Sequence, residues 1–341
     1  MAILELRKRY HKNKLSEFAD KMREISAKIG FKVSARGWCY LLETERYINK
    51  DQFDKVEGLI NSCRKQGLLP VDFVAEEKAR EFEGVERIDK LSVVKDSEGW
   101  LNGFENSGDH YTPNWWKGER YYIQMIVEKV DLISLFKPVC DEYHIPIANS
   151  KGWGSVLQRA TYARRYKEAE DLGLECVLLY CGDHDPDGLR ISEFLRSNLD
   201  DLRDVRWSDG ESGYDPENLI IDRFGLNYDF IIENDLTWID NLITGSGKNL
   251  AAPNHKNHNM PYLQAYLRDI GERKVEANAI VTTPGAARAL CEAAIVSYVG
   301  EDCKERFELK RKEAVDEFDE FLDSSGAREL VNQLREIIYN Y

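Results

Sequence analysis

Residues 121–199 alternate between short apolar segments and helical segments, and this alternation limits the possible folds more than any other feature of the chain. The apolar segments, which we predict to be strands, are YYIQMIV, IPIAN and CVLLYC. Amphipathic helices are predicted to follow each of them. Strands that alternate with helices form parallel sheets covered by helices on both faces. The sequence therefore predicts an α/β domain with a mainly parallel sheet.

Acidic residues follow two of these predicted strands. Glu128 comes directly after the first strand, and Asp183 and Asp185 follow the third, within GDHDPDG. Because ligands of parallel sheets bind outside the carboxyl ends of the strands, we expect the three carboxylates to meet at one edge. A helix cap or a solvated turn is the alternative role for clustered aspartates.

Carboxylates gathered at one place repel one another and raise one another's pKa, unless a cation is bound between them. Ligation by carboxylates alone favours a hard ion, so we expect Mg²⁺ at Glu128, Asp183 and Asp185. Asp187 and Lys129 are expected to support these ligands from the side. Gly188 permits a tight turn before the next helix.

The first 65 residues are basic, although the whole chain has a net charge of −14. They carry 15 Lys and Arg against 9 Asp and Glu, which leaves a net charge of −20 for the remainder. Helical spacing predicts helices within residues 15–30, 34–47 and 51–67, and residues 68–84 resemble an extended hairpin. This order is typical of a winged helix, which places one helix in the DNA major groove. A small helical subdomain without DNA contact is the alternative.

Arg36 and Tyr40 lie on one face of the second predicted helix, because they are four residues apart. A tyrosine beside a guanidinium can act as a phenolic nucleophile next to a phosphate-binding cation. Packing in an amphipathic helix is the more common role of a tyrosine.

These motifs resemble those of a known family. IVEK followed by GDHDPDG is similar to the Toprim fold, which has one glutamate after its first strand and Asp-x-Asp after a later one. With Arg-x-x-x-Tyr in a preceding winged helix, the chain resembles the A subunit of topoisomerase VI and the related meiotic double-strand-break transesterases. The resemblance implies a winged helix followed by a Toprim domain, and Mg²⁺-dependent cleavage of double-stranded DNA.

The resemblance also implies roles for single residues and partners. Tyr40 would form a 5′-phosphotyrosyl bond, Arg36 would position the phosphate, and Glu128, Asp183 and Asp185 would hold Mg²⁺. Members of this family act as homodimers in which the tyrosine of one subunit reaches the metal of the other. A separate ATPase subunit drives strand passage in topoisomerase VI, and TGSGKN here departs from the phosphate-binding loop that an ATPase needs.

The same motifs leave two other functions open. One is a hydrolytic Toprim nuclease of a defence or mobile-element system, in which water is the nucleophile. The other is a non-catalytic DNA-binding subunit that retains the fold. In each case the helix before the third strand offers a basic patch for the phosphate backbone, with surface salt bridges as the alternative use. The patch consists of Arg159, Arg164, Arg165 and Lys167.

We expect an N-terminal helical arm at 1–30, a winged helix at 31–100, a linker at 101–120, and a Toprim domain with a helical extension at 121–341. No stretch approaches the roughly 18 apolar residues of a membrane span, and no signal peptide is evident. The seven scattered cysteines are typical of reduced thiols. We therefore expect a cytoplasmic protein without a membrane partner, associated with the nucleoid if the source is prokaryotic.

Overall fold

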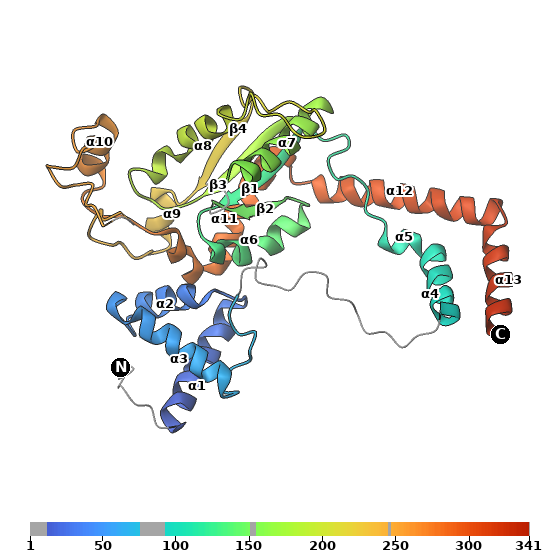
Figure 1. Cartoon of the computed structure of the whole chain (residues 1–341), viewed down its shortest axis with the longest axis horizontal. Coiled ribbons are helices and arrows are strands. Elements are labelled where there is room, and N and C mark those ends of the chain that lie inside the picture. Colours follow the sequence, from blue (N-terminus) through green and yellow to red (C-terminus); the bar gives the residue numbers. More distant parts are fainter. Residues whose placement is uncertain (1–11, 76–92, 151–154, 245–246, 341) are drawn as a thin grey trace. The chain divides into compact units, whose positions relative to one another are not determined.

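The computed structural model describes residues 12–75, 93–150, 155–244 and 247–340. Internal contacts divide the chain into two compact units. Unit 1 comprises Met1–Glu76 and Arg120–Tyr298, and unit 2 comprises Glu77–Glu119 and Val299–Tyr341. Figure 1 labels the elements of both units. Each unit is thus assembled from two separate stretches of sequence.

Unit 1 contains a parallel sheet of four strands, which confirms the predicted α/β architecture. The strands are β1 (Tyr121–Val127), β2 (Ile147–Asn149), β3 (Glu175–Cys181) and β4 (Ile220–Gly225). Their order in the sheet is β2-β1-β3-β4, and every neighbouring pair is parallel. The segment that forms β4 was not among the predicted strands. It extends the sheet beyond β3 and completes one edge.

Helices cover both faces of the sheet (Figure 1). On one face, α7 (Val156–Asp171) and α8 (Ile191–Asp200) enclose a core that includes Leu178 and Tyr180 of β3. On the other face, α6 (Val130–Glu142) packs with α11 (Pro284–Val299), whose Glu292 accepts a hydrogen bond from the Tyr143 hydroxyl at 2.7 Å. Alternate residues of β3 therefore belong to different cores, as the two-residue period of a strand requires.

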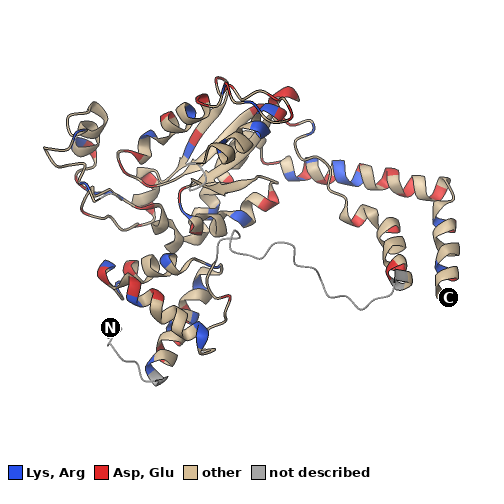
Figure 2. Ribbon diagram, viewed as in Figure 1, with Lys and Arg blue, Asp and Glu red and all other residues tan. Residues whose placement is uncertain are grey.

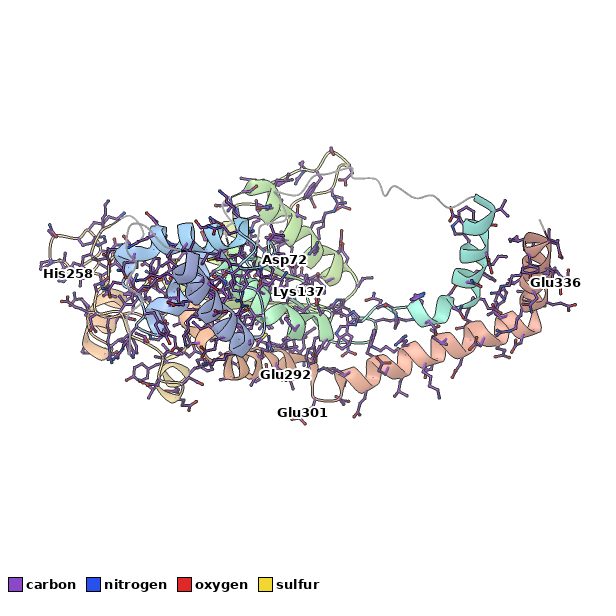
Figure 3. All side chains as sticks on the ribbon, turned by 90° about the horizontal axis from the view of Figure 1, so that it is seen from below. Asp72, Lys137, His258, Glu292, Glu301 and Glu336 are labelled. Carbon is purple, nitrogen blue, oxygen red and sulfur yellow. The ribbon has the colours of Figure 1, made fainter. Side chains whose placement is uncertain are left out.

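The outer surface of α6 is polar. There Lys137, labelled in Figure 3, lies one turn before Asp141 and forms an ion pair with it. The helix continues through Pro138 to Glu142.

The N-terminal part of unit 1 consists of the helices α1 (Lys12–Ile29), α2 (Ala35–Thr44) and α3 (Phe53–Lys65), with the short 3₁₀ helix η1 (Lys50–Gln52) before α3. The three predicted helices are present. Leu68–Ala75 forms turns without a strand, and the rest of the expected hairpin, residues 76–84, lies outside the described residues.

Helix α1, which falls within the N-terminal helical arm expected at 1–30, packs against α3. Phe18 and Met22 of α1 are fully buried. The Cys63 thiol of α3 donates a hydrogen bond to the Leu15 carbonyl at 3.7 Å. The described part of α1 belongs to the same helical core as α2 and α3, because burial of its apolar face requires their side chains.

Unit 1 is completed by the short helices that follow the strands. They are η4 (Gly188–Arg190), α9 (Tyr228–Glu233), α10 (Pro261–Asp269) and η5 (Ala277–Thr282). Helix α2 packs against η5. The Ser34 amide before α2 donates to Asp131 of α6 at 2.6 Å, and Gly37 has no space for a side chain beside that carboxylate. Within unit 1, these contacts therefore hold the helical region, α1 to α3, against the sheet region, which is the sheet with the helices that follow its strands.

The described part of unit 2 contains α4 (Val93–Glu105), α5 (Ser107–His110), α12 (Cys303–Ser324) and α13 (Ala327–Tyr339). Arg335 of α13 donates to Glu105 of α4, and Trp115 packs on Phe307 of α12 with ring centroids 4.7 Å apart. Acidic and basic residues are interspersed along α12 (Figure 2).

The contact-based units divide the chain at other positions than the expected domains. Residues 101–119, most of the expected linker, lie in unit 2, where Phe104 packs on Phe318 and Trp115 on Phe307. Residues 299–341, the expected helical extension, lie in unit 2 as well. Seven free cysteines, all buried, are distributed over both units. No helix in the described part of the chain is both long and apolar enough to cross a membrane.

Candidate active site

The candidate active site lies where the chain connections leave the sheet in opposite directions. From β1 the chain passes to β2 on one side, and from β3 it passes to β4 on the other. Val127 of β1 is aligned with Cys181 of β3, so Glu128 and Asp183 follow neighbouring strand ends. This is the switch point at which open parallel sheets bind ligands.

The backbone orients the Glu128 carboxylate toward the end of β3. The Glu128 amide donates to the Cys181 carbonyl at 3.0 Å, and the Asp183 amide donates to Glu128 Oε2 at 2.7 Å. Gly182 is required between them, because a Cβ there would lie 2.7 Å from Glu128 Oε2. Of the three carboxylates predicted to meet at one edge of the sheet, Glu128 and Asp183 are therefore brought together.

The ammonium of Lys129 lies between these two carboxylates. Lys129 Nζ is 2.7 Å from Glu128 Oε1 and 3.1 Å from Asp183 Oδ2. Burial lowers the pKa of Lys129, but the charges of Asp183 and Glu128 together raise it by more. The pKa of Lys129 therefore lies above its usual value. We expected Lys129 at the side of the site, and the structure instead places its charge at the centre.

Asp183 and Asp185 both line the cleft described below. His184, between them, pairs with Val275 in an antiparallel bridge and turns its side chain toward Tyr228, Trp238 and Tyr266. The chain bends at Asp185, directly after this bridge.

Asp185 is oriented by the turn that follows it. The Gly188 amide donates to Asp185 Oδ1 at 2.6 Å. A side chain at Gly188 would place its Cβ 2.2 Å from the Asp183 carbonyl oxygen, so only glycine allows this approach. Asp187 is exposed and accepts a hydrogen bond from the Tyr262 hydroxyl at 3.3 Å.

Burial is the main influence on the titration of these acids. It raises the pKa of Glu128, and Asp183 raises it further, while Lys129 opposes the shift. Burial likewise raises the pKa of Asp185, against the lowering effect of its hydrogen bond from Gly188. A positive charge at this site lowers the free energy of both ionised carboxylates.

The chemistry of the oxygen donors fits Mg²⁺. One oxygen of each of Glu128, Asp183 and Asp185 accepts a backbone N–H, from Asp183, Ala277 and Gly188 respectively. Lys129 binds the second oxygen of Glu128 and of Asp183. Within the described residues no three His, Cys, Asp or Glu side chains are gathered as a ready metal site. The residues that would hold Mg²⁺ are Glu128, Asp183 and Asp185, and the Lys129 ammonium would compete with the metal for the first two.

Two parts of the site were not predicted. Arg223 of β4 donates to the carbonyls of Asp183 and Gly188, both at 3.0 Å. These bonds fix the segment 183–188, which we call the acidic loop. The Ala277 amide donates to Asp183 Oδ1 at 2.6 Å from 94 residues further along the chain. An arginine within the apolar segment LIIDRFGL was a signal for the first contact, whereas a backbone amide leaves no signal in a sequence.

Tyr40 and Arg36 lie on α2. Arg36 Nη1 is 3.1 Å from Glu57 Oε1 and 3.4 Å from Asp54 Oδ1, and its guanidinium lies over Phe53. Burial and Glu276 raise the pKa of the half-buried Tyr40, whereas Arg36 and Lys129 lower it. The contact of α2 with η5 thus brings Tyr40 within the electrostatic influence of Lys129 of the same chain.

Glu276 forms ion pairs with one lysine of the helical region and one of the sheet region. It lies 3.8 Å from Lys50, just before α3, and 3.7 Å from Lys274. It directly precedes Ala277, whose amide binds Asp183.

The four residues of the predicted basic patch have different environments. Arg164 forms ion pairs with Asp209, Glu211 and Glu168, and the Lys167 ammonium donates to Ser212 Oγ at 2.8 Å. For Arg164 this is the salt-bridge alternative. Arg165 is exposed. Arg159 alone among the four lines the cleft beside the acids.

This cleft has a volume of about 870 Å³ and opens beside the carboxylates. Its walls come from the acidic loop, α7, α8 and the segment before α10. They include Glu128, Asp183, Asp185, Arg159, Arg190, Phe194, Met260 and Tyr262. Its size is within the range of small-ligand sites.

Comparisons with known proteins give no family for the chain. No protein-family model matches it, and no curated protein matches it at a significant level.

Proposed function

We propose that this protein cleaves DNA strands by transesterification at Tyr40, with Mg²⁺ held by Glu128, Asp183 and Asp185. The observation that carries the proposal is the meeting of Glu128 and Asp183, 55 residues apart, around one ammonium at the switch point of the sheet. Helix α2 contacts η5, whose Ala277 amide donates a hydrogen bond to Asp183. This contact supports a role for Tyr40 beside this site. The winged helix and the Toprim fold are part of the same proposal.

In this mechanism Tyr40 Oη attacks the scissile phosphorus, and a 5′-phosphotyrosyl bond forms as the bond to the 3′ oxygen breaks. The phenol loses its proton, and the leaving 3′ oxygen gains one. Mg²⁺, when bound, neutralises charge on the phosphate. Burial raises the pKa of Tyr40, and Arg36 opposes this rise, which favours the phenolate. Glu128, Asp183 and Asp185 would hold the metal, and the Lys129 ammonium, which pairs with Glu128 and Asp183, is a cation at the site that could pair with a phosphate oxygen.

The proposal extends to partners and location. The resemblance to topoisomerase VI supports double-stranded DNA as the substrate, a homodimer as the active form, and a separate ATPase subunit for any strand passage. It also supports a cytoplasmic site of action, at the nucleoid in a prokaryote. Sedimentation of the purified chain with and without a DNA duplex tests the dimer, for which twice the monomer mass is expected.

Cleavage of supercoiled plasmid DNA in Mg²⁺ tests the mechanism. We expect nicked or linear DNA that carries a protease-sensitive adduct, and we expect EDTA to prevent both. Tyr40→Phe should lose at least about 99% of the cleavage and all of the adduct, because the variant lacks the phenolic oxygen that attacks the phosphate in this mechanism. Tyr47→Phe is the matched control, since Tyr47 is also half-buried in the helical region, and it should cleave like the unaltered chain.

Hydrolysis by water is the second candidate, and the raised pKa of Tyr40 favours it, because a phenol that ionises less readily is a weaker nucleophile. The metal ligands are common to both mechanisms. Asp183→Asn should abolish cleavage in either case. Full cleavage by Tyr40→Phe without an adduct would decide for hydrolysis and against transesterification.

A further inference from the structure

The cleft beside the acidic loop changes character along its length. Its inner end carries Glu128, Asp183 and Asp185, whereas its other walls carry aromatic and apolar groups. Phe194 and Met260 line it with 48% and 47% of their surface exposed. A site for phosphate chemistry alone needs charge and metal ligands, so partly exposed apolar groups beside it require another explanation.

The aromatic wall is built around Arg190. Its guanidinium carbon lies 4.4 Å from the centroid of the Tyr262 ring and 5.7 Å from that of Phe194. Tyr262 is fixed by its hydrogen bond to Asp187 at 3.3 Å. Planar aromatic and guanidinium groups of this kind are the surfaces on which unpaired bases stack.

Arg159 provides a second, independent indication of the ligand. Its Nη1 donates to the backbone and side-chain oxygens of Asn198, at 3.0 and 3.2 Å. Its Nε is buried and has no hydrogen-bond partner among the described residues. A buried guanidinium N–H without a partner is costly. Arg159 also lines the cleft, where its positive charge would attract a phosphate.

We propose that this cleft holds an unpaired nucleotide of the DNA strand, with its phosphate at Arg159 and its base stacked on Tyr262, Arg190 and Phe194. A paired base has its faces covered by its neighbours in the duplex, so the wall selects single-stranded or extruded nucleotides. The inference rests on the proposed function for its substrate strand. It narrows that substrate to DNA with an unpaired nucleotide beside the scissile phosphate.

Binding of oligonucleotides tests the stacking. The probes are a fluorescently labelled strand of twelve thymidines and the same strand with abasic sugars, titrated in Ca²⁺ and followed by anisotropy. We expect the base-containing strand to bind about tenfold more tightly, since one stacked base contributes about 1–3 kcal/mol. Tyr262→Leu should remove this preference and leave the abasic strand unaffected, while Tyr262→Phe should retain it.

Two further variants keep the test decisive. Phe194→Ala, at an exposed position, should also reduce the preference, and it serves if Tyr262→Leu does not fold. Tyr228→Leu alters a tyrosine that packs against His184 and Trp238 instead, and it should leave the preference unchanged. The proposal is overturned if the unaltered chain binds both strands equally, if Tyr262→Leu weakens both equally, or if free thymidine monophosphate competes as well as the strand.

This result can be separated from that of the proposed function. Cleavage with an adduct, but with no preference for bases, would refute the stacking alone. A preference for bases without any cleavage would refute the catalytic proposal alone.

Discussion

Replacement of Lys129 by methionine tests whether its ammonium stands where a metal would bind. The two oxygens that it joins lie within about 6 Å of each other, and two unit charges at that distance repel by about 3 kcal/mol at an effective dielectric constant of about 20. The side chains of Lys129, Glu128 and Asp183 are 29%, 24% and 13% exposed, so solvent reduces the effect. We expect Lys129→Met to lower the free energy of unfolding by about 2 kcal/mol without metal.

Mg²⁺ should reverse this loss, because the variant offers the same carboxylates without a competing ammonium. Urea unfolding followed by circular dichroism, in EDTA and in Mg²⁺, measures both effects, and calorimetric titration measures the affinity for the metal. We expect tighter Mg²⁺ binding and a larger gain in stability on Mg²⁺ addition than in the unaltered chain.

The pH dependence adds a check on sign. The pKa of Glu128 is already raised by burial and Asp183, and loss of Lys129 raises it further. A carboxyl whose pKa is higher in the folded state binds its proton more tightly there. The free energy of unfolding is therefore higher at low pH and falls as the pH rises through that pKa. The variant should therefore be destabilised less at pH 5 than at pH 8.

Lys137→Met is the matched control, because Lys137 forms an exposed ion pair with Asp141 on the same helix (Figure 3). Such a pair contributes about 0.5 kcal/mol or less. The reasoning would be refuted if Lys129→Met cost no more stability than Lys137→Met, or if Mg²⁺ bound the Lys129 variant no more tightly than the unaltered chain.

Three further predictions follow from the same contacts. Gly37→Ala should cost about 1–3 kcal/mol in urea unfolding, since its Cβ would lie 2.4 Å from Asp131 Oδ2; unchanged stability would contradict the packing of α2. If Tyr40 attacks as phenolate, the rate of single-turnover cleavage should rise about tenfold per pH unit from pH 7 to 9 without a plateau, because the pKa of Tyr40 is raised above its usual value. A plateau near pH 7 would point to another nucleophile. Arg159→Ala should weaken DNA binding by more than about fivefold in anisotropy titrations, and Arg165→Ala by about twofold or less, since of the two only Arg159 lines the cleft. Equal losses in the two variants would disprove this distinction.

The sequence by itself determined the features that depend on local periodicity. Apolar runs flanked by helical patterns specified the first three strands and their parallel arrangement, because a strand buried on both faces needs a continuous apolar run. The positions of Glu128 and Asp183 directly after two of those strands were enough to predict that their carboxylates meet. Helices within residues 15–67 were likewise evident from their apolar spacing.

The tertiary structure alone decided what depends on contacts between distant segments. Lys129 lies between the carboxylates because β1 and β3 are neighbours, and the Ala277 amide binds Asp183 because η5 returns to the sheet edge. The separation of unit 2 also depends on pairing two stretches almost 200 residues apart, such as Glu119 with Arg306. Backbone amides and long-range pairings carry no periodic signal, since their partners are selected by the packed fold and not by neighbouring residues.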